Sequence, residues 1–231
     1  MIREVLRLCG LDKDQIFDRL AKFAGCGVDF KVEEDCLDAK IEMTSNLDKE
    51  RFNEIRCAIY ATFENEIYSA SDIGLPQLVK HYLKTNGRTL GVAESLTGGM
   101  ICQKLTAIEG ISKYFYEGIV CYDKSSKILR LGVSRNTLET YGAISKQTAY
   151  EMVQGIATAP VDIGLATTGL AGPAGDEGKP VGLVYIGVGA GEFILTFEKH
   201  FKGDREQIRK CATNCALFYL LRYLMGNVWT L

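Results

Sequence analysis

Glycine is unevenly distributed along this chain, and the difference divides the sequence into two parts. Only four of the 24 glycines fall within residues 1–75, and the other 20 lie among short apolar runs in the rest of the 231 residues. Residues 1–75 hold 16 acidic and 10 basic side chains, a formal charge of −6, whereas the remainder holds 13 and 17, a charge of +4. Glycine-rich turns between apolar runs indicate a domain whose site is built from loops. We therefore expect a small domain, residues 1–72, and a larger one, residues 73–231.

The first part has the pattern of a small α+β domain. Asp12 fits the N-cap of a helix over residues 12–24, and Gly25 fits its end. Apolar and polar residues alternate over 28–32 and 37–43, as in two half-buried strands, with a solvated acidic turn between them. An apolar stripe then predicts a long amphipathic helix over 48–66, followed by a short strand near 67–68.

Strands and helices alternate through the second part, which favours an α/β fold with layered sheet and helices. Pro76, Ser145 and Asp204 each fit the start of a helix. The predicted helices cover residues 76–85, 145–157 and 204–225, with another from about residue 97. The predicted strands cover 89–93, 162–168, 182–189 and 193–197, and a further apolar strand, GIVCY, lies within 112–122.

Composition excludes several classes of protein. Hydrophobic residues make up 47% and charged residues 24%, which are values of a globular protein. The net charge of −2 argues against a strongly basic nucleic-acid-binding protein. The longest apolar run, 216–225, is too short to span a bilayer, and the N-terminus lacks the pattern of a signal peptide. We expect a cytoplasmic protein that binds neither membranes nor nucleic acid.

Eight cysteines are scattered along the chain without a CxxC pair. They are most simply reduced, small, buried side chains. Cys211 and Cys215 are four residues apart on a predicted helix and would supply two metal ligands, but a site needs about four. The two histidines, His81 and His200, lie in no ligand-like cluster. We therefore expect no metal site.

The segment LGVAESLTGG, residues 90–99, carries the strongest chemical signal. Ser95 falls on the turn between an apolar strand and a helix, where unpaired backbone N–H groups and the helix dipole suit an oxyanion, a phosphate or a carboxylate. The placement follows the logic of a nucleophile elbow without being a GxSxG motif. The structural alternative is that Ser95 and Thr97 cap the helix and the glycines allow tight packing.

A serine nucleophile needs a base, and the scarcity of histidine argues against a Ser-His-Asp triad. Lysine can serve when desolvation or a positive neighbour lowers its pKa. Tyr122, Lys124 and Lys127 follow the strand-like run GIVCY and are the candidates. The alternative is a capped surface helix with two solvated lysines.

Two further segments suggest a ligand. Residues 167–182 follow a strand and are too rich in glycine for an ordinary connection, although they lack the order of a P-loop. Arg205, at the start of the last helix, either clamps an anionic ligand or pairs with an acidic side chain.

Together these segments resemble the C-terminal domain of the CinA family, the nicotinamide mononucleotide deamidases. The matching pieces are, in the family order, AESLTGG, EGIVCYDKSSK, LGVSRNTLETYGAISKQTAYEMVQG, TTGLAGPAGDEGKPVG and FKGDREQIR. They cover about residues 77–225. The first part resembles the small KH-like middle domain of longer CinA proteins, so we expect their molybdopterin-binding-like domain and its metal-dependent pyrophosphatase activity to be absent.

The resemblance implies hydrolysis of the carboxamide of nicotinamide mononucleotide to nicotinate mononucleotide and ammonia, by a homo-oligomer that needs no cofactor. It places the family's nucleophile at Ser95, its tyrosine at Tyr122 and its lysine at Lys127. In the expected scheme Lys127, helped by Tyr122, takes the proton of Ser95, which attacks the amide carbon. Backbone N–H groups of the turn hold the oxyanion, and further residues line the pocket or bind the phosphate. These oxyanion and substrate-binding positions are Leu96, Thr97, Gly98, Gly99, Thr168, Gly169, Gly172 and Arg205.

The chain departs from the family pattern at three positions. Leu96 replaces a common cysteine, which leaves the backbone donor intact, and Ala174 stiffens the glycine-rich loop. Lys124 replaces a common asparagine, and its charge either lowers the pKa of Lys127 by repulsion or displaces the substrate. Lys124 therefore supports an alternative function, a nucleotide-sensing or protein-interaction module that keeps the pocket without turnover.

Nucleic-acid binding by the KH-like part is a third hypothesis, and we disfavour it. Residues 1–72 hold no GxxG loop with flanking lysines, and the charge of −6 over residues 1–75 opposes phosphate binding.

Overall fold

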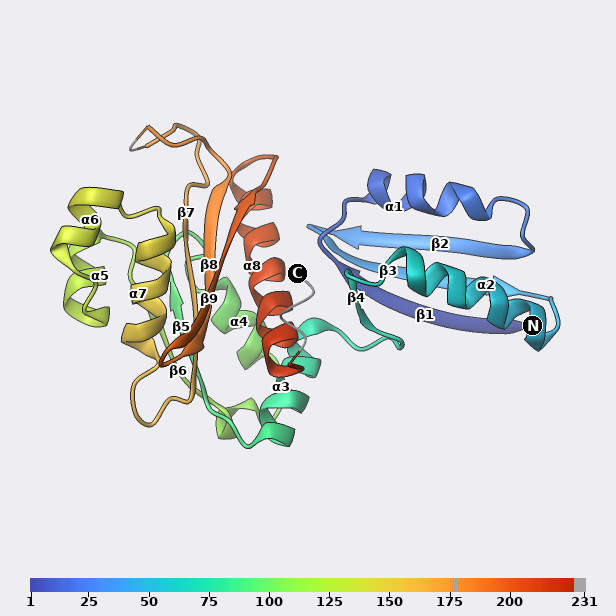
Figure 1. Cartoon of the computed structure of the whole chain (residues 1–231), viewed down its shortest axis with the longest axis horizontal. Helices are drawn as coiled ribbons and strands as arrows, with labels where there is room; N and C mark the ends of the chain where they lie inside the picture. The colour runs from blue at the N-terminus through green and yellow to red at the C-terminus, as the bar shows by residue number, and fades with distance from the viewer. Residues whose placement is uncertain (177, 227–231) are drawn as a thin grey trace. The chain divides into compact units, whose positions relative to one another are not determined.

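The structure, a computed structural model, describes residues 1–176 and 178–226 (Figure 1). The chain forms two compact units, residues 1–75 and a second unit from Pro76 onward, and each is described by itself. No helix in the described ranges is long and apolar enough to cross a membrane.

The first unit is an antiparallel sheet with two helices on one face. Its strand order is β2-β3-β1-β4. Both helices share one hydrophobic core with the sheet, which includes Leu6, Ile16, Ile41 and Phe52. The elements are β1 (Ile2–Cys9), α1 (Lys13–Leu20), the 3₁₀ helix η1 (Ala21–Phe23), β2 (Val28–Asp35), β3 (Asp38–Ser45), α2 (Lys49–Thr62) and β4 (Ile67–Ser69).

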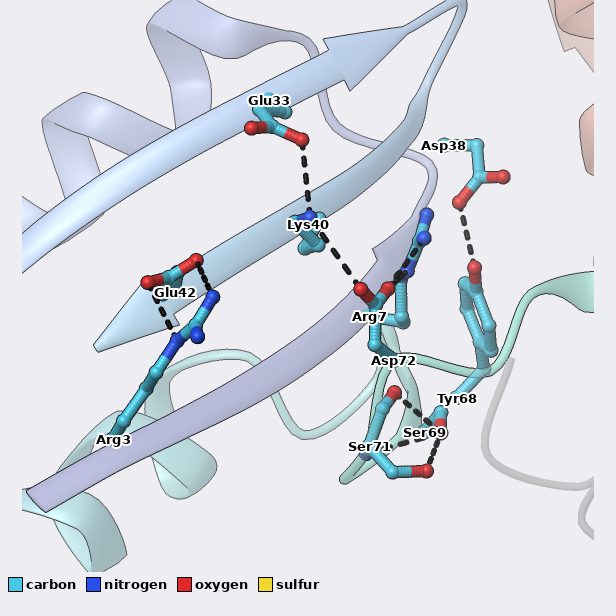
Figure 2. Close-up of polar contacts among 10 residues, drawn as sticks. All are labelled: Arg3, Arg7, Glu33, Asp38, Lys40, Glu42, Tyr68, Ser69, Ser71 and Asp72. Carbon is cyan, nitrogen blue, oxygen red and sulfur yellow. Dashed lines mark hydrogen bonds and ion pairs between the residues drawn. The ribbon is translucent and has the colours of Figure 1, made fainter. Parts of the chain in front are cut away.

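Strand β1 was not predicted from the sequence, yet it lies inside the sheet between β3 and β4. Its alternation is obscured by two arginines, whose partners lie far along the chain. Arg3 Nε lies 2.8 Å from Glu42 Oε1, and Arg7 Nη2 lies 2.6 Å from Asp72 Oδ1 (Figure 2). The two arginines of β1 are thus explained by ion-pair partners that lie far away in the sequence.

The predicted acidic turn is also wrong in its position. Residues 33–35 belong to β2, and the chain reverses at Cys36 and Leu37, which both have positive φ. Glu33 is held between lysines, with Lys40 Nζ 3.2 Å from Glu33 Oε2. The polar side of the sheet thus carries a set of paired charges, here named the charged sheet face: Arg3, Arg7, Glu33, Lys40, Glu42 and Asp72 (Figure 2).

The second unit has the layered α/β architecture predicted from the alternation of strands and helices. In its sheet, β6-β5-β7-β8-β9, the strands β6, β5 and β7 run parallel to one another. Strand β8 is antiparallel to both of its neighbours, β7 and β9. The elements are α3 (Leu75–Asn86), β5 (Leu90–Glu94), α4 (Met100–Thr106), the 3₁₀ helix η2 (Ile111–Lys113), β6 (Phe115–Val120), α5 (Lys124–Leu131), α6 (Arg135–Tyr141), α7 (Lys146–Ile156), β7 (Ile163–Gly169), β8 (Leu183–Ala190), β9 (Phe193–His200) and α8 (Arg205–Leu224).

Helices cover both faces of this sheet (Figure 1). Helix α7 packs on one face with α5 and α6 against it, and α8 packs with α4 on the other. The core on the α7 side includes Ala93, Cys121, Met152 and Ala166. Glu94 pairs with Thr167 in the parallel register of β5 and β7, so the residues that follow both strands emerge at one edge. Carboxyl ends of parallel strands are where α/β folds build their sites.

One predicted helix in this unit needs correction, and one helix was missed. The helix expected from about residue 97 begins at Met100, because residues 96–99 form a turn in which Gly98 and Gly99 have φ of +58° and +95°. Those angles strain any residue with a Cβ, which explains the paired glycines. Helix α6 was not predicted at all.

Candidate active site

Ser95 is the first residue after β5, and the neighbouring strand fixes its backbone. Its N–H donates to Thr167 O at 3.0 Å. A hydrogen bond of 2.8 Å joins the hydroxyls of Thr97 and Thr167, so the turn is also tied to β7 through side chains. The side chain of Ser95 is buried. The Ser95 hydroxyl is therefore presented from a rigid strand end.

Lys127 lies in the first turn of α5 and reaches the serine. Its Nζ lies 2.9 Å from Ser95 Oγ and 2.6 Å from the carbonyl oxygen of Cys121. Lys127 is only 1% exposed. Asp123 caps the helix, accepting from the N–H of Ser125 at 2.8 Å. The alternative of a capped surface helix is thus right about the helix and wrong about Lys127, which is buried, while Lys124 is exposed.

A short chain of hydrogen bonds connects serine and lysine through the backbone. The carbonyl oxygen of Glu94 accepts from the N–H of Cys121 at 2.9 Å. The carbonyl of Cys121 in turn holds Lys127, and Lys127 contacts Ser95, the residue next to Glu94. These hydrogen bonds fix the position of Lys127 Nζ relative to the hydroxyl of Ser95.

The side chain of Glu94 is a functional feature that the sequence analysis missed. Its carboxylate is completely buried and accepts from the N–H groups of Gly99 at 2.9 Å, Ile101 at 3.3 Å and Cys102 at 2.9 Å. The N-terminus of α4 is therefore filled by the chain's own carboxylate. Burial, together with Glu94, raises the pKa of the Cys102 thiol. The sequence did offer a signal for this role, because Glu94 is an acidic residue at the end of an apolar strand and just before a helix.

These contacts narrow the choice of oxyanion donors in the turn. The N–H of Gly98 donates to Ser95 O at 3.1 Å, and that of Gly99 is engaged by Glu94. In the described part of the chain no protein acceptor is recorded for the N–H of Leu96, the residue directly after Ser95. Leu96 also lines the pocket beside the serine. Of the predicted donors, its N–H is the best placed.

Arg209 secures the same turn from α8 and was also missed. Its Nε donates to Leu96 O at 2.9 Å, and its Nη2 donates to Thr97 O at 3.1 Å. Arg209 lies one helical turn beyond Arg205, and this spacing was the only sequence signal. By holding two carbonyls on one side, it orients the peptide groups of the turn.

A pocket of about 340 Å³ lies in front of the serine and lysine. Thr168 stands in its wall, with its hydroxyl donating to Ala143 O at 2.7 Å. Of the predicted site residues, seven line the pocket: Ser95, Leu96, Tyr122, Lys127, Thr168, Gly169 and Arg205. The other four, Thr97, Gly98, Gly99 and Gly172, do not line it.

Tyr122 and Arg205 meet each other at this pocket. Arg205 Nη2 donates to Tyr122 Oη at 2.8 Å, and Nη1 donates to Gly172 O at 2.5 Å. Tyr122 is 61% exposed. The structure thus gives the tyrosine a guanidinium partner rather than the expected contact with Lys127. Arg205 is held by a phenol and a carbonyl, where an acidic partner or an anion was expected. Within residues 1–176 and 178–226, no three His, Cys, Asp or Glu side chains gather as metal ligands.

Comparison with known sequences identifies relatives for this architecture. The profile of the CinA C-terminal domain matches residues 73–224. CinA-like proteins of Fusobacterium nucleatum and Kosmotoga olearia are 45% and 42% identical over 71% and 70% of this chain, and 38% and 40% of theirs. A competence-damage inducible protein of Clostridium tetani is 34% identical over 97% of this chain and 57% of its own. The chain spans about half the length of the curated relatives it matches.

Solved structures show the same similarity in three dimensions. CinA superfamily proteins from Klebsiella pneumoniae and Escherichia coli are both 33% identical to this chain, with TM-scores of 0.64 and 0.63. The matches cover 66% and 69% of this chain and 96% of each solved chain. Because the profile covers most of the second unit and several relatives exceed 30% identity over more than two thirds of the sequence, the chain belongs to the CinA family.

Proposed function

We propose that the chain is an amidohydrolase that converts nicotinamide mononucleotide to nicotinate mononucleotide and ammonia. The contact of 2.9 Å between Lys127 Nζ and Ser95 Oγ carries this proposal. A base within hydrogen-bond reach of a serine hydroxyl is the signature of an activated nucleophile. Both side chains are buried beside a pocket, so a substrate bound there could reach them.

The reaction starts with proton transfer from Ser95 to Lys127. Desolvation favours the neutral amine form of Lys127, and in this form Nζ accepts the proton of the Ser95 hydroxyl. Meanwhile an N–H of Lys127 keeps donating to the carbonyl oxygen of Cys121. Ser95 Oγ bonds to the amide carbon, whose oxygen becomes negative. The C–N bond then breaks, and the nitrogen leaves as ammonia with the proton from Lys127. Water then loses a proton to Lys127 and attacks the acyl carbon. The bond from that carbon to Ser95 Oγ breaks, Lys127 returns the proton to Oγ, and nicotinate mononucleotide is released.

The surrounding residues stabilise and orient this chemistry. The N–H of Leu96 faces the developing oxyanion. Removing such a donor typically raises the activation free energy by about 3–4 kcal/mol. Arg205, held by Tyr122, supplies positive charge for the substrate phosphate. Tyr122 acts in this scheme by positioning Arg205.

The test is direct assay of both products from nicotinamide mononucleotide, with chelator present throughout. The parent protein and Ser95→Ala are compared. Ser125→Ala serves as a matched control, because that serine is exposed and its hydroxyl donates to Asp123, the N-cap of α5. Product release by the parent and the control, but not by Ser95→Ala, supports the proposal. Full activity of Ser95→Ala overturns it. Nucleotide binding without release supports the nucleotide-sensing module instead, which Lys124 at the pocket favours.

A further inference from the structure

A second cavity of about 640 Å³ adjoins the catalytic pocket. Lys124 lines both cavities, and Gly142 of the second is followed directly by Ala143 and Ile144 of the first. The second cavity lies between α5, α6 and the glycine-rich loop, and its wall consists of Lys124, Ile128, Arg135, Leu138, Glu139, Thr140, Tyr141, Gly142 and Lys179. The proposed reaction uses none of these residues.

Positive charge predominates in this cavity. Three cations, Lys124, Arg135 and Lys179, stand against one carboxylate, Glu139. Lys179 is built into the wall, because its Nζ donates to Tyr141 O at 2.7 Å and to Ile144 O at 2.6 Å. Lys124 and Arg135 are exposed side chains on the first residues of α5 and α6. A concave basic surface of this kind attracts phosphate groups.

The same cavity offers a surface for a flat ring. Ile128 and Leu138 form an apolar part of the wall, and Tyr141 beside them is 47% exposed. Exposed aromatic side chains stack favourably on nucleobases, because every base has a flat π face. Glu139 provides carboxylate oxygens, which in nucleotide sites accept hydrogen bonds from ribose hydroxyls.

The two cavities differ in size in a way that suits a two-part ligand. Ligand sites usually occupy about 300–1,000 Å³. The catalytic pocket, about 340 Å³, is at the lower end of this range, and the second cavity is nearly twice as large. Lys124 stands at their junction, where a linking group would pass.

We infer that the chain binds a dinucleotide whose carboxamide-bearing half occupies the catalytic pocket and whose other half occupies the second cavity. The phosphate of the first half lies at Arg205, as proposed for the mononucleotide, and the second phosphate lies against Lys124 and Arg135. The second base lies against Tyr141 and Leu138. The inference rests on the proposed function and enlarges its substrate class. The chemistry is unchanged: water is consumed, the C–N bond of the amide breaks, and ammonia and the carboxylate dinucleotide form.

The experiment compares nicotinamide mononucleotide with nicotinamide adenine dinucleotide as substrates of the full chain. Arg135→Ala removes a cation from the second cavity, and Arg130→Ala removes an exposed arginine of α5 that does not line it. We expect Arg135→Ala to raise the KM for the dinucleotide about tenfold and to leave the KM for the mononucleotide within about twofold. Arg130→Ala should change neither value.

Dissociation constants of both nucleotides for Ser95→Ala, with and without Arg135→Ala, separate this inference from the proposed reaction. Dinucleotide binding that weakens about tenfold in the double variant supports the second cavity even if the parent hydrolyses nothing. Equal effects of Arg135→Ala on both nucleotides, no effect on either, or failure of the dinucleotide to bind would overturn the inference. Hydrolysis of the mononucleotide would stand in each of those cases.

Discussion

The charged sheet face of the first unit and the buried polar cluster around Ser95 use similar side chains in opposite settings. On the sheet face, Arg7 pairs with Asp72 and Lys40 with Glu33, and the carboxylate side chains are about half exposed. Around Ser95, the Nζ atom of Lys127 contacts a hydroxyl and a carbonyl, and the carboxylate of Glu94 accepts from three backbone N–H groups. Both of these side chains are completely or almost completely buried.

The first set of side chains lies in contact with water, whereas the second lies beside or within the proposed catalytic pair. Water and salt screen exposed ion pairs, which consequently contribute little to stability. Burying a charge is unfavourable unless its hydrogen bonds are made, so such groups persist mainly where function requires them. The same substitution should therefore have very different effects in the two regions.

Replacing lysine by methionine in each region gives the largest expected contrast. Lys127→Met keeps the volume of the side chain and removes the base, so kcat for amide hydrolysis should fall by about 10⁴-fold or more. Lys40→Met removes one ion-pair partner on the charged sheet face and should leave kcat unchanged. Steady-state kinetics of both purified variants measure kcat for comparison with the parent protein. A Lys127→Met protein with more than about a tenth of the parental kcat would exclude lysine as the base.

Replacing a carboxylate in each region should separate the two by stability. Glu94→Ala leaves the N–H groups at the start of α4 unsatisfied and opens a void, so the free energy of unfolding should fall by about 3 kcal/mol or more. Glu94→Gln retains one acceptor oxygen and should lose less. Glu42→Ala, from the charged sheet face, should show no resolved change in urea unfolding. Equal losses at Glu94 and Glu42 would contradict the comparison.

Acid should weaken the charged sheet face. The hydrogen bond from Arg7 lowers the pKa of Asp72, so the ionised form is favoured in the folded state. Its stabilisation is present above the ordinary carboxyl pKa of about 4 and disappears as pH falls through the lowered value. Asp72→Asn should therefore increase hydrogen exchange in β1 at neutral pH, and the difference from the parent should vanish in acid. A difference that persists at the lowest pH would assign it to packing.

Cysteine reactivity should give the smallest but most local contrast. Burial and the neighbouring Glu94 raise the pKa of Cys102, which keeps the thiol protonated in mildly alkaline solution, whereas Cys57 is exposed on α2. Iodoacetamide should alkylate Cys102 roughly 100-fold more slowly than Cys57 at about pH 8, as followed by mass spectrometry. Glu94→Gln should speed the reaction at Cys102 alone. Similar rates at both cysteines in the parent would show that α4 opens readily.

Elements defined by local side chains were predictable from the sequence. Ser145 accepts from the N–H of Thr148 at 3.1 Å and Asp204 from that of Gln207 at 2.9 Å, so the starts of α7 and α8 are encoded within four residues. Alternating strands and helices then favoured the layered fold. Strand β1 escaped prediction because the partners of Arg3 and Arg7 lie 39 and 65 residues away.

The candidate site divides in the same manner. Ser95 and Lys127 stand out by their turn, their spacing and the family resemblance, and the structure brings them together. Glu94 and Arg209 did not stand out, because their partners are backbone atoms that no side-chain pattern reveals. The contact of Tyr122 with Arg205 spans 83 residues, and sequence reasoning assigned the tyrosine to the nearer Lys127 instead.

The contact between Arg209 and the serine turn also bears on how the protein is made. Arg209 and Leu96 are 113 residues apart, and the carbonyls of the turn stay without this guanidinium until α8 has been synthesised and docked. Contacts of such long range close late in folding, because the entropy of the intervening chain must be overcome first. A nascent chain that has reached β7 already carries Ser95 and Lys127, but not the helix that orients their turn. The turn that carries the proposed nucleophile therefore reaches its final geometry late in folding.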